Sequence, residues 1–245
     1  MPHVEGAGVA LHYVERGEGP AALVVHGMAS DALAWQSALD QLAAGGLRAV
    51  ALDRRGYGAS GAPEPYAATT VPEQAEDVAA LAAALDLVPA LLVGDGFGAL
   101  IVLELLVRRP ELARAAVLAD PPLHAFVPAA TAALAGERTL LEAGLREGGP
   151  AAALRAWLGE AAVAADPARA ERAVAAAAGF FADYAGQSSW SPSRGELRAI
   201  AVPVAVLTDP DTPEHTVAAA VALAGLLPDA RRASDGDVVA AVRAM

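Results

Sequence analysis

One stretch decides the fold of this chain: Leu91-Leu92-Val93-Gly94-Asp95-Gly96-Phe97-Gly98-Ala99-Leu100. Apolar residues run directly into a turn that contains three glycines, and a pattern typical of a helix follows from Phe97. We therefore predict a buried strand, a sharp turn and a helix. Gly94 and Gly98 let the strand and the helix approach each other closely, because neither carries a side chain. Gly96 then lies at the tip of the turn, where the strand ends.

Strand and helix patterns alternate on both sides of this stretch. The expected strands cover residues 9–16, 21–25, 47–52, 90–93, 115–119, 202–207 and 230–233. The expected helices cover residues 31–44, 71–85, 97–109, 213–227 and 237–245. We expect the first two strands to pair as a hairpin. The alternation as a whole predicts an α/β fold, with a mostly parallel sheet and helices on both faces.

Residues 123–200 break the alternation. The segment is rich in alanine and predicts three or four helices. The expected breaks are near Gly136, Gly148-Gly149-Pro150, Asp166-Pro167 and residues 186–193. Because the segment lies between two expected strands, we predict a helical cap at 123–200, inserted into a core formed by residues 1–122 and 201–245.

The composition excludes several classes of function. The chain has 245 residues, 55% of them hydrophobic, which is typical of one α/β domain with an insertion. Its net charge of −12 comes with arginine but no lysine, which argues against binding to nucleic acid or to an anionic membrane. No apolar run approaches the roughly 20 residues that span a bilayer, and the start of the chain shows no signal-peptide pattern, so we expect a cytoplasmic protein. There is no cysteine, and no histidine pair has metal-ligand spacing, so we expect neither a metal nor another cofactor.

Three motifs resemble those of the α/β-hydrolase superfamily, in the same order and at similar spacing. His26-Gly27, with Trp35 nine residues after His26, resembles the family's oxyanion loop. Asp53-Arg54-Arg55-Gly56-Tyr57-Gly58-Ala59-Ser60 resembles its D-x-R-G-x-G-x-S loop. The turn from Gly94 to Gly98 resembles its nucleophile elbow, G-x-S-x-G. The resemblance covers nearly the whole chain and implies the α/β-hydrolase fold, with an inserted helical cap.

The catalytic machinery that the resemblance implies is incomplete. Gly96 occupies the position of the nucleophilic serine. The triad histidine is expected after the last strand, where the chain reads Ala233-Ser234-Asp235-Gly236-Asp237 and contains no histidine. Serine-type acyl transfer needs nucleophile and base together. We therefore predict no ordinary ester hydrolysis through an acyl-enzyme.

The oxyanion donors do not depend on side chains. The backbone N–H groups of Met28 and Phe97 fall where the resemblance implies such donors, each worth about 3 kcal/mol when negative charge develops. The alternative is that these amides persist only as part of the fold. His26 and Gly27 are expected to order this loop of the pocket.

Two side chains are candidates for a catalytic acid or base. Asp211 falls where the triad acid is expected, beyond the strand at 202–207. The alternative is an aspartate that serves the turn. His124 lies just past the strand at 115–119, at the base of the expected cap, and is the best-placed base in the sequence. The alternative is a loop histidine without a catalytic role.

Asp95 and Trp190 complete the candidate pocket. Relatives such as epoxide hydrolases use an aspartate in the serine position, but Asp95 lies one position before it. We therefore expect the Asp95 side chain to point away from the pocket and to serve the structure. Trp190 either packs between helices or lines a ligand cavity. Gly96 enlarges the floor of that cavity, which suits a bulky ligand.

These residues support three hypotheses. The first, which we favour, is a non-hydrolytic enzyme of the cyclase, isomerase or lyase type, with His124 or Asp211 as acid or base and a mostly apolar substrate from natural-product biosynthesis. The second is a catalytically dead hydrolase homologue that binds a small molecule. The third is a hydrolase that activates water directly. A polar pocket favours the first and a sealed apolar pocket the second. The expected partner is a small molecule in all three, and the oligomeric state stays open.

Overall fold

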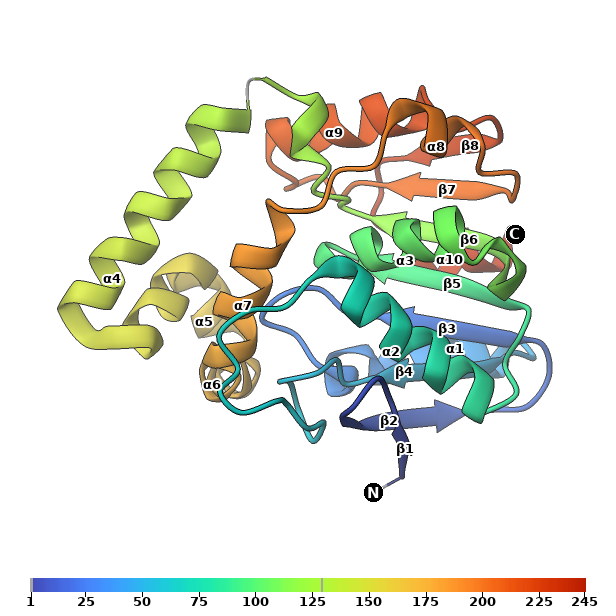
Figure 1. The fold of residues 1–245 in the computed structure, drawn as a ribbon, viewed down its shortest axis with the longest axis horizontal. Coiled ribbons are helices and arrows are strands. Elements are labelled where there is room, and N and C mark those ends of the chain that lie inside the picture. Colours follow the sequence, from blue (N-terminus) through green and yellow to red (C-terminus); the bar gives the residue numbers. More distant parts are fainter. Residues whose placement is uncertain (1, 129) are drawn as a thin grey trace.

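A computed structural model describes residues 2–128 and 130–245 of the chain. Its centre is an eight-stranded sheet in the order β1-β2-β4-β3-β5-β6-β7-β8 (Figure 1). The strands are β1 His3–Glu5, β2 Ala10–Arg16, β3 Ala21–Val25, β4 Arg48–Leu52, β5 Ala90–Asp95, β6 Ala113–Ala119, β7 Val204–Leu207 and β8 Ala230–Ala233. The strands from β4 to β8 in this order run parallel, whereas the described pairs β1–β2 and β2–β4 are antiparallel. The predicted mostly parallel sheet is confirmed.

The predicted hairpin of the first two strands is wrong. The partner of β2 is β4, with Tyr13 opposite Leu52, and not β3. All five residues of β3 are buried, and β3 pairs in parallel with β4 on one side and β5 on the other. Its side chains pack against the helices on both faces of the sheet, so β3 lies in the middle of the sheet. The link at residues 17–20 therefore crosses to an inner position instead of closing a hairpin.

Helices cover both faces of the sheet. The helices of the α/β part are α1 Gln36–Ala44, α2 Val71–Ala84, α3 Phe97–Arg108, α9 Glu214–Ala224 and α10 Val238–Arg243. Side chains alternate along each central strand, because successive residues point to opposite faces. In β3, Leu23 and Val25 pack on the side of α2, α3 and α9, whereas Val24 packs on the side of α1 and α10. Both faces are buried, which explains the uninterrupted apolar runs of these strands.

The turn between β5 and α3 has the predicted geometry. A β-carbon on Gly98 would lie 2.1 Å from the carbonyl oxygen of Val25, and one on Gly94 would lie 2.6 Å from the Cα of Ala99. These two positions therefore require glycine. Gly96 has φ +50°, a conformation that L side chains rarely adopt, but a β-carbon there would meet only Gly27 Cα, at 3.7 Å. The tip of the turn has space for a side chain and carries none.

Among the described residues, five α-helices and a short 3-10 helix, His124–Phe126, lie between β6 and β7, where three or four helices were predicted. The five α-helices are α4 Ala130–Leu158, α5 Glu160–Ala165, α6 Pro167–Ala175, α7 Ala177–Gln187 and α8 Arg194–Arg198. A kink at Gly148 and Gly149 and the boundary at Asp166 fall where breaks were predicted. The break predicted at Gly136 is wrong, because α4 continues through this exposed position, where glycine costs only about 1 kcal/mol. Figure 1 shows α4 standing away from the sheet, with α5, α6 and α7 beside it.

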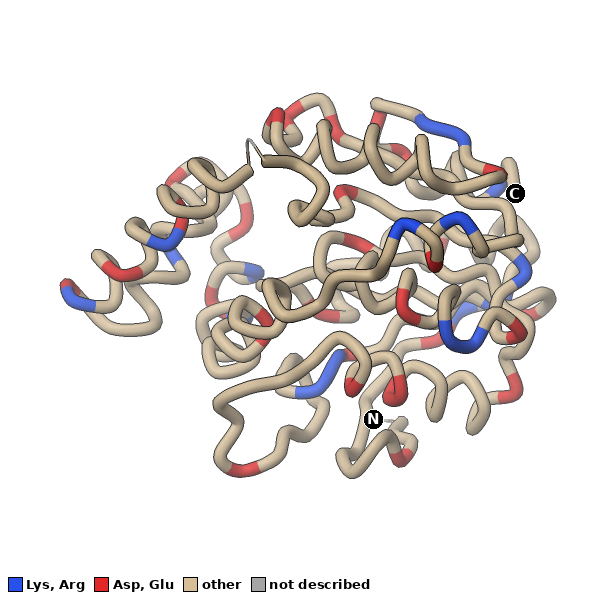
Figure 2. The backbone as a smooth tube through the Cα atoms, turned by 45° about the horizontal axis from the view of Figure 1, so that its top comes forward, with Lys and Arg blue, Asp and Glu red and all other residues tan. Residues whose placement is uncertain are grey.

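Helix length and the distribution of charge bear on which partners the protein could bind. Within residues 2–128 and 130–245, no helix is both long enough and apolar enough to cross a membrane. Figure 2 shows acidic and basic positions interspersed along the chain. The boundaries predicted between core and cap, after residues 122 and 200, stay a prediction.

Candidate functional site

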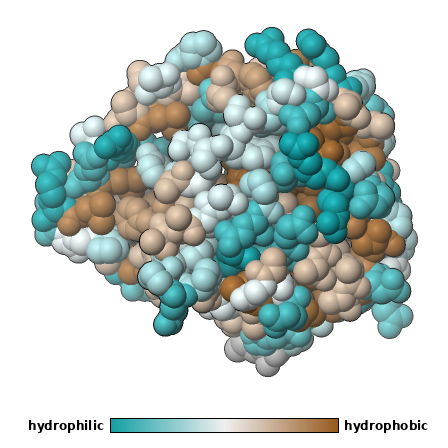
Figure 3. Space-filling view, viewed as in Figure 1, coloured by the Kyte–Doolittle hydropathy of each residue, from teal (hydrophilic) through white to brown (hydrophobic). Residues whose placement is uncertain are grey.

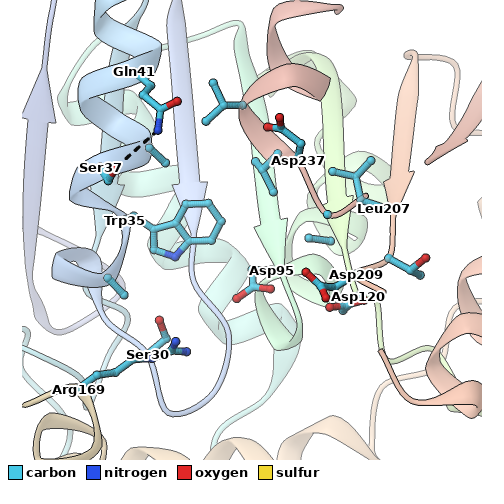
Figure 4. Close-up of a pocket in the computed structure, with 17 residues that line it drawn as sticks. Ser30, Trp35, Ser37, Gln41, Asp95, Asp120, Arg169, Leu207, Asp209 and Asp237 are labelled. Atoms are coloured by element: carbon cyan, nitrogen blue, oxygen red, sulfur yellow. Dashed lines mark hydrogen bonds between the residues drawn. The ribbon is translucent and has the colours of Figure 1, made fainter. Parts of the chain in front are cut away.

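A cavity of about 470 Å³ opens at the carboxyl ends of β5, β6 and β7; we call it the strand-end cavity. In an open parallel sheet, ligands bind outside the carboxyl ends of the strands, where the strand order reverses. Here the order reverses around β3 and β5. Figure 4 shows three carboxylates grouped at the strand ends and the ring of Trp35 across the cavity from them. The lining includes Trp35, Asp95, Asp120, Arg169, Asp209 and Asp237.

Asp95 lies at the centre of this cavity, next to Gly96. The prediction that its side chain points away from the pocket does not match this placement. A β-carbon on Gly27 would come within 3.1 Å of Asp95 Oδ2, so the carboxylate lies against the loop that follows β3. Burial, and next the charge of Asp120, raise the pKa of Asp95 to about 6. A carboxyl group with this pKa can both accept and release a proton near neutral pH.

Replacement of Asp95 by asparagine is expected to stabilise the fold above pH 6. The folded protein holds the Asp95 proton more tightly than the unfolded chain, so wild-type stability falls as pH rises from the unfolded pKa to about 6. Asparagine removes this loss. We expect a gain of about 1–3 kcal/mol at about pH 8 that disappears near pH 4, measured by urea unfolding. Asp40→Asn, at an exposed carboxylate, is the control; a gain for Asp95→Asn that does not depend on pH would contradict the raised pKa.

The neighbouring carboxylates are held by the loops that carry them. Asp120 follows β6 with φ +45°, and its Oδ1 accepts a hydrogen bond from the Thr212 hydroxyl at 2.6 Å. Thr212 Oγ1 in turn accepts from the backbone N–H of Asp209 at 2.8 Å. Asp237 Oδ1 caps α10 through the N–H of Ala240. The Asp95 carboxylate is instead held by a hydrogen bond with the backbone of Gly27.

The loop after β3 is fixed by Arg54. The Gly27 carbonyl accepts from His26 Nδ1 at 2.7 Å and from Arg54 Nη2 at 3.0 Å. The Gly27–Met28 bond is not among the cis peptides, and in a trans peptide the C=O and N–H groups point in opposite directions. The N–H of Met28 therefore points away from Arg54. At the elbow, Phe97 is the first residue of α3, and the N–H at this position has no partner within its own helix.

Both ring nitrogens of His26 form hydrogen bonds with backbone groups. Its Nε2 accepts from the backbone N–H of Arg54 at 3.0 Å, while Nδ1 binds the Gly27 carbonyl. Burial, and next the positive charge of Arg54, hold the pKa of His26 well below its usual value. His26 therefore orders the loop as a neutral ring.

The same arginine connects this loop to α7. Arg54 Nη2 forms a buried ion pair of 2.7 Å with Asp183, whose side chain is 0% exposed. Asp183 also accepts from the Tyr57 hydroxyl at 2.6 Å and from Gln74 Nε2 at 2.6 Å. All four polar side chains of this network are buried and paired, which is the condition for such a network to stabilise a fold.

The two predicted acid or base residues are not brought together. His124 lines a second cavity, beneath α4, and burial followed by the proximity of His215 lowers its pKa to about 4. Asp211 is exposed, and Asp209 lines the strand-end cavity in its place. Trp190 lines the second cavity, and its Nε1 donates to Glu104 Oε2 at 2.8 Å. No histidine is among the described residues that line the strand-end cavity.

Sequence reasoning missed Asp120, Asp209 and Arg169 as site residues. The signal for the two aspartates was present, because Asp95, Asp120 and Asp209 each end or follow a parallel strand. Carboxyl ends of parallel strands meet at one edge of the sheet. Arg169 lies on α6, far along the chain, and no local pattern links it to this edge. Within the described ranges, no three acidic or histidine side chains are placed to hold a metal ion.

A tight turn between strand and helix, a fixed loop after β3 and a sheet of this strand order define an α/β-hydrolase scaffold. A family model for the alpha/beta hydrolase fold matches residues 20–140. An alpha/beta hydrolase from Sphaerobacter thermophilus DSM 20745 superimposes with a TM-score of 0.80, at 21% identity, over 99% of both chains. These matches confirm the predicted α/β-hydrolase fold.

The curated relatives match part of the chain. An epoxide hydrolase of Caballeronia sordidicola is 36% identical over 104 residues, which are 42% of this chain and 32% of the relative. A bifunctional epoxide hydrolase 2 of Sus scrofa is 32% identical over 115 residues, 47% of this chain and 21% of the relative. The chain therefore matches a third or less of the length of each of these proteins.

Proposed function

We propose that this protein is a non-hydrolytic enzyme that moves a proton on a carbonyl-bearing small molecule in the strand-end cavity. The observation that carries the proposal is the Asp95 carboxyl group, with a pKa near 6, in the cavity beside Gly96. Asp95 is the acid or base, and the N–H groups of Met28 and Phe97 stabilise the oxyanion. His124 and Asp211 have no part in this assignment, because His124 lines another cavity and Asp211 is exposed. Met28 and Phe97 are not among the described lining residues either. Their N–H groups are assigned because they follow Gly27 and Gly96, which adjoin Asp95.

The reaction needs no covalent intermediate. Asp95, as carboxylate, takes a proton from the carbon next to the substrate carbonyl. The electron pair of that C–H bond forms a C=C bond, and the carbonyl electrons move to the oxygen, which becomes an enolate held by the two amides. In a substrate with a second C=C bond next to the enolate, Asp95 then returns its proton to the γ-carbon, the C=C bond shifts and the carbonyl re-forms. Alternatively, a leaving group on the β-carbon departs with its bonding electron pair and takes up the proton. A base with a pKa close to the working pH is the most effective at both steps.

A second candidate function is hydrolysis by activated water. It is favoured by the matched relatives, whose names are those of epoxide hydrolases. Asp95 takes a proton from water instead of from carbon, and the water oxygen bonds to the electrophilic carbon of the substrate. The bond from that carbon to its leaving oxygen breaks, and Asp95 returns the proton to the leaving oxygen. Both functions use the same carboxylate. They differ in that only hydrolysis transfers the oxygen of water to the product.

Proton exchange tests the proposal directly. Wild-type protein is incubated with a panel of ketones, lactones and thioesters in D2O, and deuterium next to the carbonyl is measured by NMR. We expect exchange that falls by about 100-fold or more in Asp95→Asn, and no change in Asp40→Asn, at an exposed position. Full exchange in Asp95→Asn would overturn the assignment of the base. Incorporation of 18O from labelled water into the product, without deuterium exchange at carbon, would establish hydrolysis. If neither reaction is observed, the protein only binds small molecules.

A further inference from the structure

The lining of the strand-end cavity carries charges of both signs. Among the described residues, Asp95, Asp120, Asp209 and Asp237 contribute carboxylates and Arg169 contributes a guanidinium group. In Figure 4 the Arg169 side chain extends from α6 toward the cavity, and its charge acts on Asp95. Within residues 2–128 and 130–245, this guanidinium group has no hydrogen bond and no ion pair of 4.0 Å or less. Its donors are therefore available to a ligand.

Two hydroxyl groups in the same lining also lack a partner. Ser30 is 7% exposed and Thr208 is 2% exposed, and neither hydroxyl forms a hydrogen bond with another described residue. Neither oxygen is sealed inside the protein, because the fully enclosed polar atoms without a partner belong to other described residues. The two oxygens therefore face the cavity that both residues line. Buried hydroxyl groups are normally hydrogen-bonded, so these two favour a ligand that supplies the missing bonds.

This mixture of donors and acceptors favours hydroxyl groups on the ligand. A carboxylate or phosphate group could accept from Arg169, but it cannot donate, and the aspartates would repel it. An ammonium group could donate to the aspartates, but it cannot accept from Arg169. A hydroxyl group carries no charge and both donates and accepts. A ligand with several hydroxyl groups can therefore pair with the carboxylates, the guanidinium group and the lining hydroxyls.

Trp35 supplies an apolar wall across the cavity from the carboxylates (Figure 4). A sugar has hydroxyl groups along its edges and C–H groups on its faces. The electron-rich face of an aromatic ring attracts the slightly positive hydrogens of C–H groups. A sugar can therefore pack against Trp35 and still direct hydroxyl groups to the strand ends. The cavity volume, about 470 Å³, is within the range for small-molecule sites.

The second cavity, beneath α4, has the opposite character. Leu134, Leu141 and Leu145 line it from α4, and Figure 3 shows hydrophobic surface between α4 and the body of the molecule. The structure describes no residue that lines both cavities. A ligand with many hydroxyl groups is therefore expected in the strand-end cavity and not beneath α4.

We infer that the substrate of the strand-end cavity is an uncharged sugar, an aldose or a ketose, bound through its hydroxyl groups and packed on Trp35. This inference rests on the proposed function, because the sugar provides the carbonyl group on which Asp95 acts. Ser30, Thr208 and Arg169 determine specificity, since they bind hydroxyl groups that take no part in the proton transfer.

Asp95 interconverts an aldose and a ketose in their open-chain forms. It takes the proton from the hydroxyl-bearing carbon next to the carbonyl group, the electron pair of that bond forms a C=C bond, and the carbonyl oxygen becomes negative. This oxygen then takes the proton of the neighbouring hydroxyl group. Asp95 returns its proton to the former carbonyl carbon, and a C=O bond forms at the neighbouring carbon. Substrate and product contain the same atoms, so the reaction needs no other reactant.

Sugar alcohols test the binding site separately from catalysis, because they have no carbonyl group and cannot react. NMR titration of the full chain compares D-glucitol with 1,2-hexanediol, which keeps the carbon chain and fewer hydroxyl groups. We expect D-glucitol to bind about 25-fold more tightly, the effect of two hydrogen bonds. D-Gluconate and D-glucamine, which end in a carboxylate and an ammonium group, are expected to bind less tightly than D-glucitol.

Substitutions in the lining identify the groups that bind the sugar. Ser30→Ala and Thr208→Val each remove one hydroxyl group, and each is expected to weaken the binding of D-glucitol about 5-fold. Trp35→Leu removes the aromatic wall and is expected to weaken it too. Ser188→Ala, at an exposed serine outside the described lining of this cavity, is the control and is expected to leave the affinity unchanged.

Other results overturn the inference. Equal binding of D-glucitol and 1,2-hexanediol, or unchanged affinity in both Ser30→Ala and Thr208→Val with native circular dichroism, would exclude a sugar site. Tighter binding of D-gluconate or D-glucamine than of D-glucitol would show a site for an ion instead. If D-glucitol binds as expected but no aldose gains deuterium next to its carbonyl group in D2O, the proposed proton transfer fails and the sugar-binding site is retained.

Discussion

Replacement of Asp183 by alanine is expected to lower the free energy of unfolding by about 3–5 kcal/mol. Asp183 is 0% exposed, and its partner Arg54 is 1% exposed. Without the carboxylate, the buried guanidinium of Arg54 keeps its charge and loses the group that balances it. The Tyr57 hydroxyl and Gln74 Nε2 lose their acceptor at the same time.

Urea unfolding of three variants tests this expectation. Asp183→Asn keeps an acceptor oxygen but removes the charge. Its free energy of unfolding is therefore expected to lie between that of the wild type and that of Asp183→Ala. Glu171→Ala breaks an exposed pair with Arg155 of similar length, 2.8 Å, and is expected to cost less than about 1 kcal/mol. If Asp183→Ala and Glu171→Ala proved equally stable, the buried pair would contribute no more than a surface pair.

Gly96→Ser is expected to hydrolyse esters only about 10³–10⁴-fold faster than water does, which is the residual catalysis left when a triad is removed. The turn has room for the side chain, because a β-carbon at residue 96 would meet only Gly27 Cα, at 3.7 Å. A serine hydroxyl is a weak nucleophile until a base takes its proton. Asp95 is held against Gly27, and no histidine is among the described residues of the cavity lining. The oxyanion amides alone account for the activity that remains.

The measurement is kcat/KM on activated esters, with and without a second change. We expect values for Gly96→Ser well below about 10⁴ M⁻¹s⁻¹, the lower end for ordinary enzymes. His124→Ala is added because His124 was the base favoured by the sequence. If Gly96→Ser reached the range of ordinary enzymes and His124→Ala removed that activity, His124 would be the base and the site would be hydrolytic.

The parts of the fold that the sequence predicted are those set by local patterns. The turn from Gly94 to Gly98 was predictable because steric contact leaves only glycine at both ends. The hairpin failed because pairing partners are set by burial on both faces of β3, which is a property of the whole sheet. The break at Gly136 failed because an exposed glycine weakens a helix only slightly.

In the candidate site too, local patterns were predictable and properties of the three-dimensional arrangement were not. The place of Gly96 at the tip of the turn was predictable from its motif, whereas the oxyanion roles of the Met28 and Phe97 amides stay predictions. The role of Asp95 could not, because its environment depends on Asp120 after the next strand and on Arg169 on α6. A raised pKa results from burial and charge in three dimensions, and no spacing in the chain encodes it.

The Arg54–Asp183 pair links residues that are 129 positions apart, and it has a consequence for motion. Asp183 is on α7, and the same guanidinium group of Arg54 donates to the carbonyl groups of His26, from Nε, and Gly27, from Nη2. If α7 swung outwards like a lid, it would withdraw the counter-charge from Arg54 and release the peptide that aims the Met28 amide. Under the proposed function, an outward movement of α7 would therefore also displace one of the two oxyanion donors.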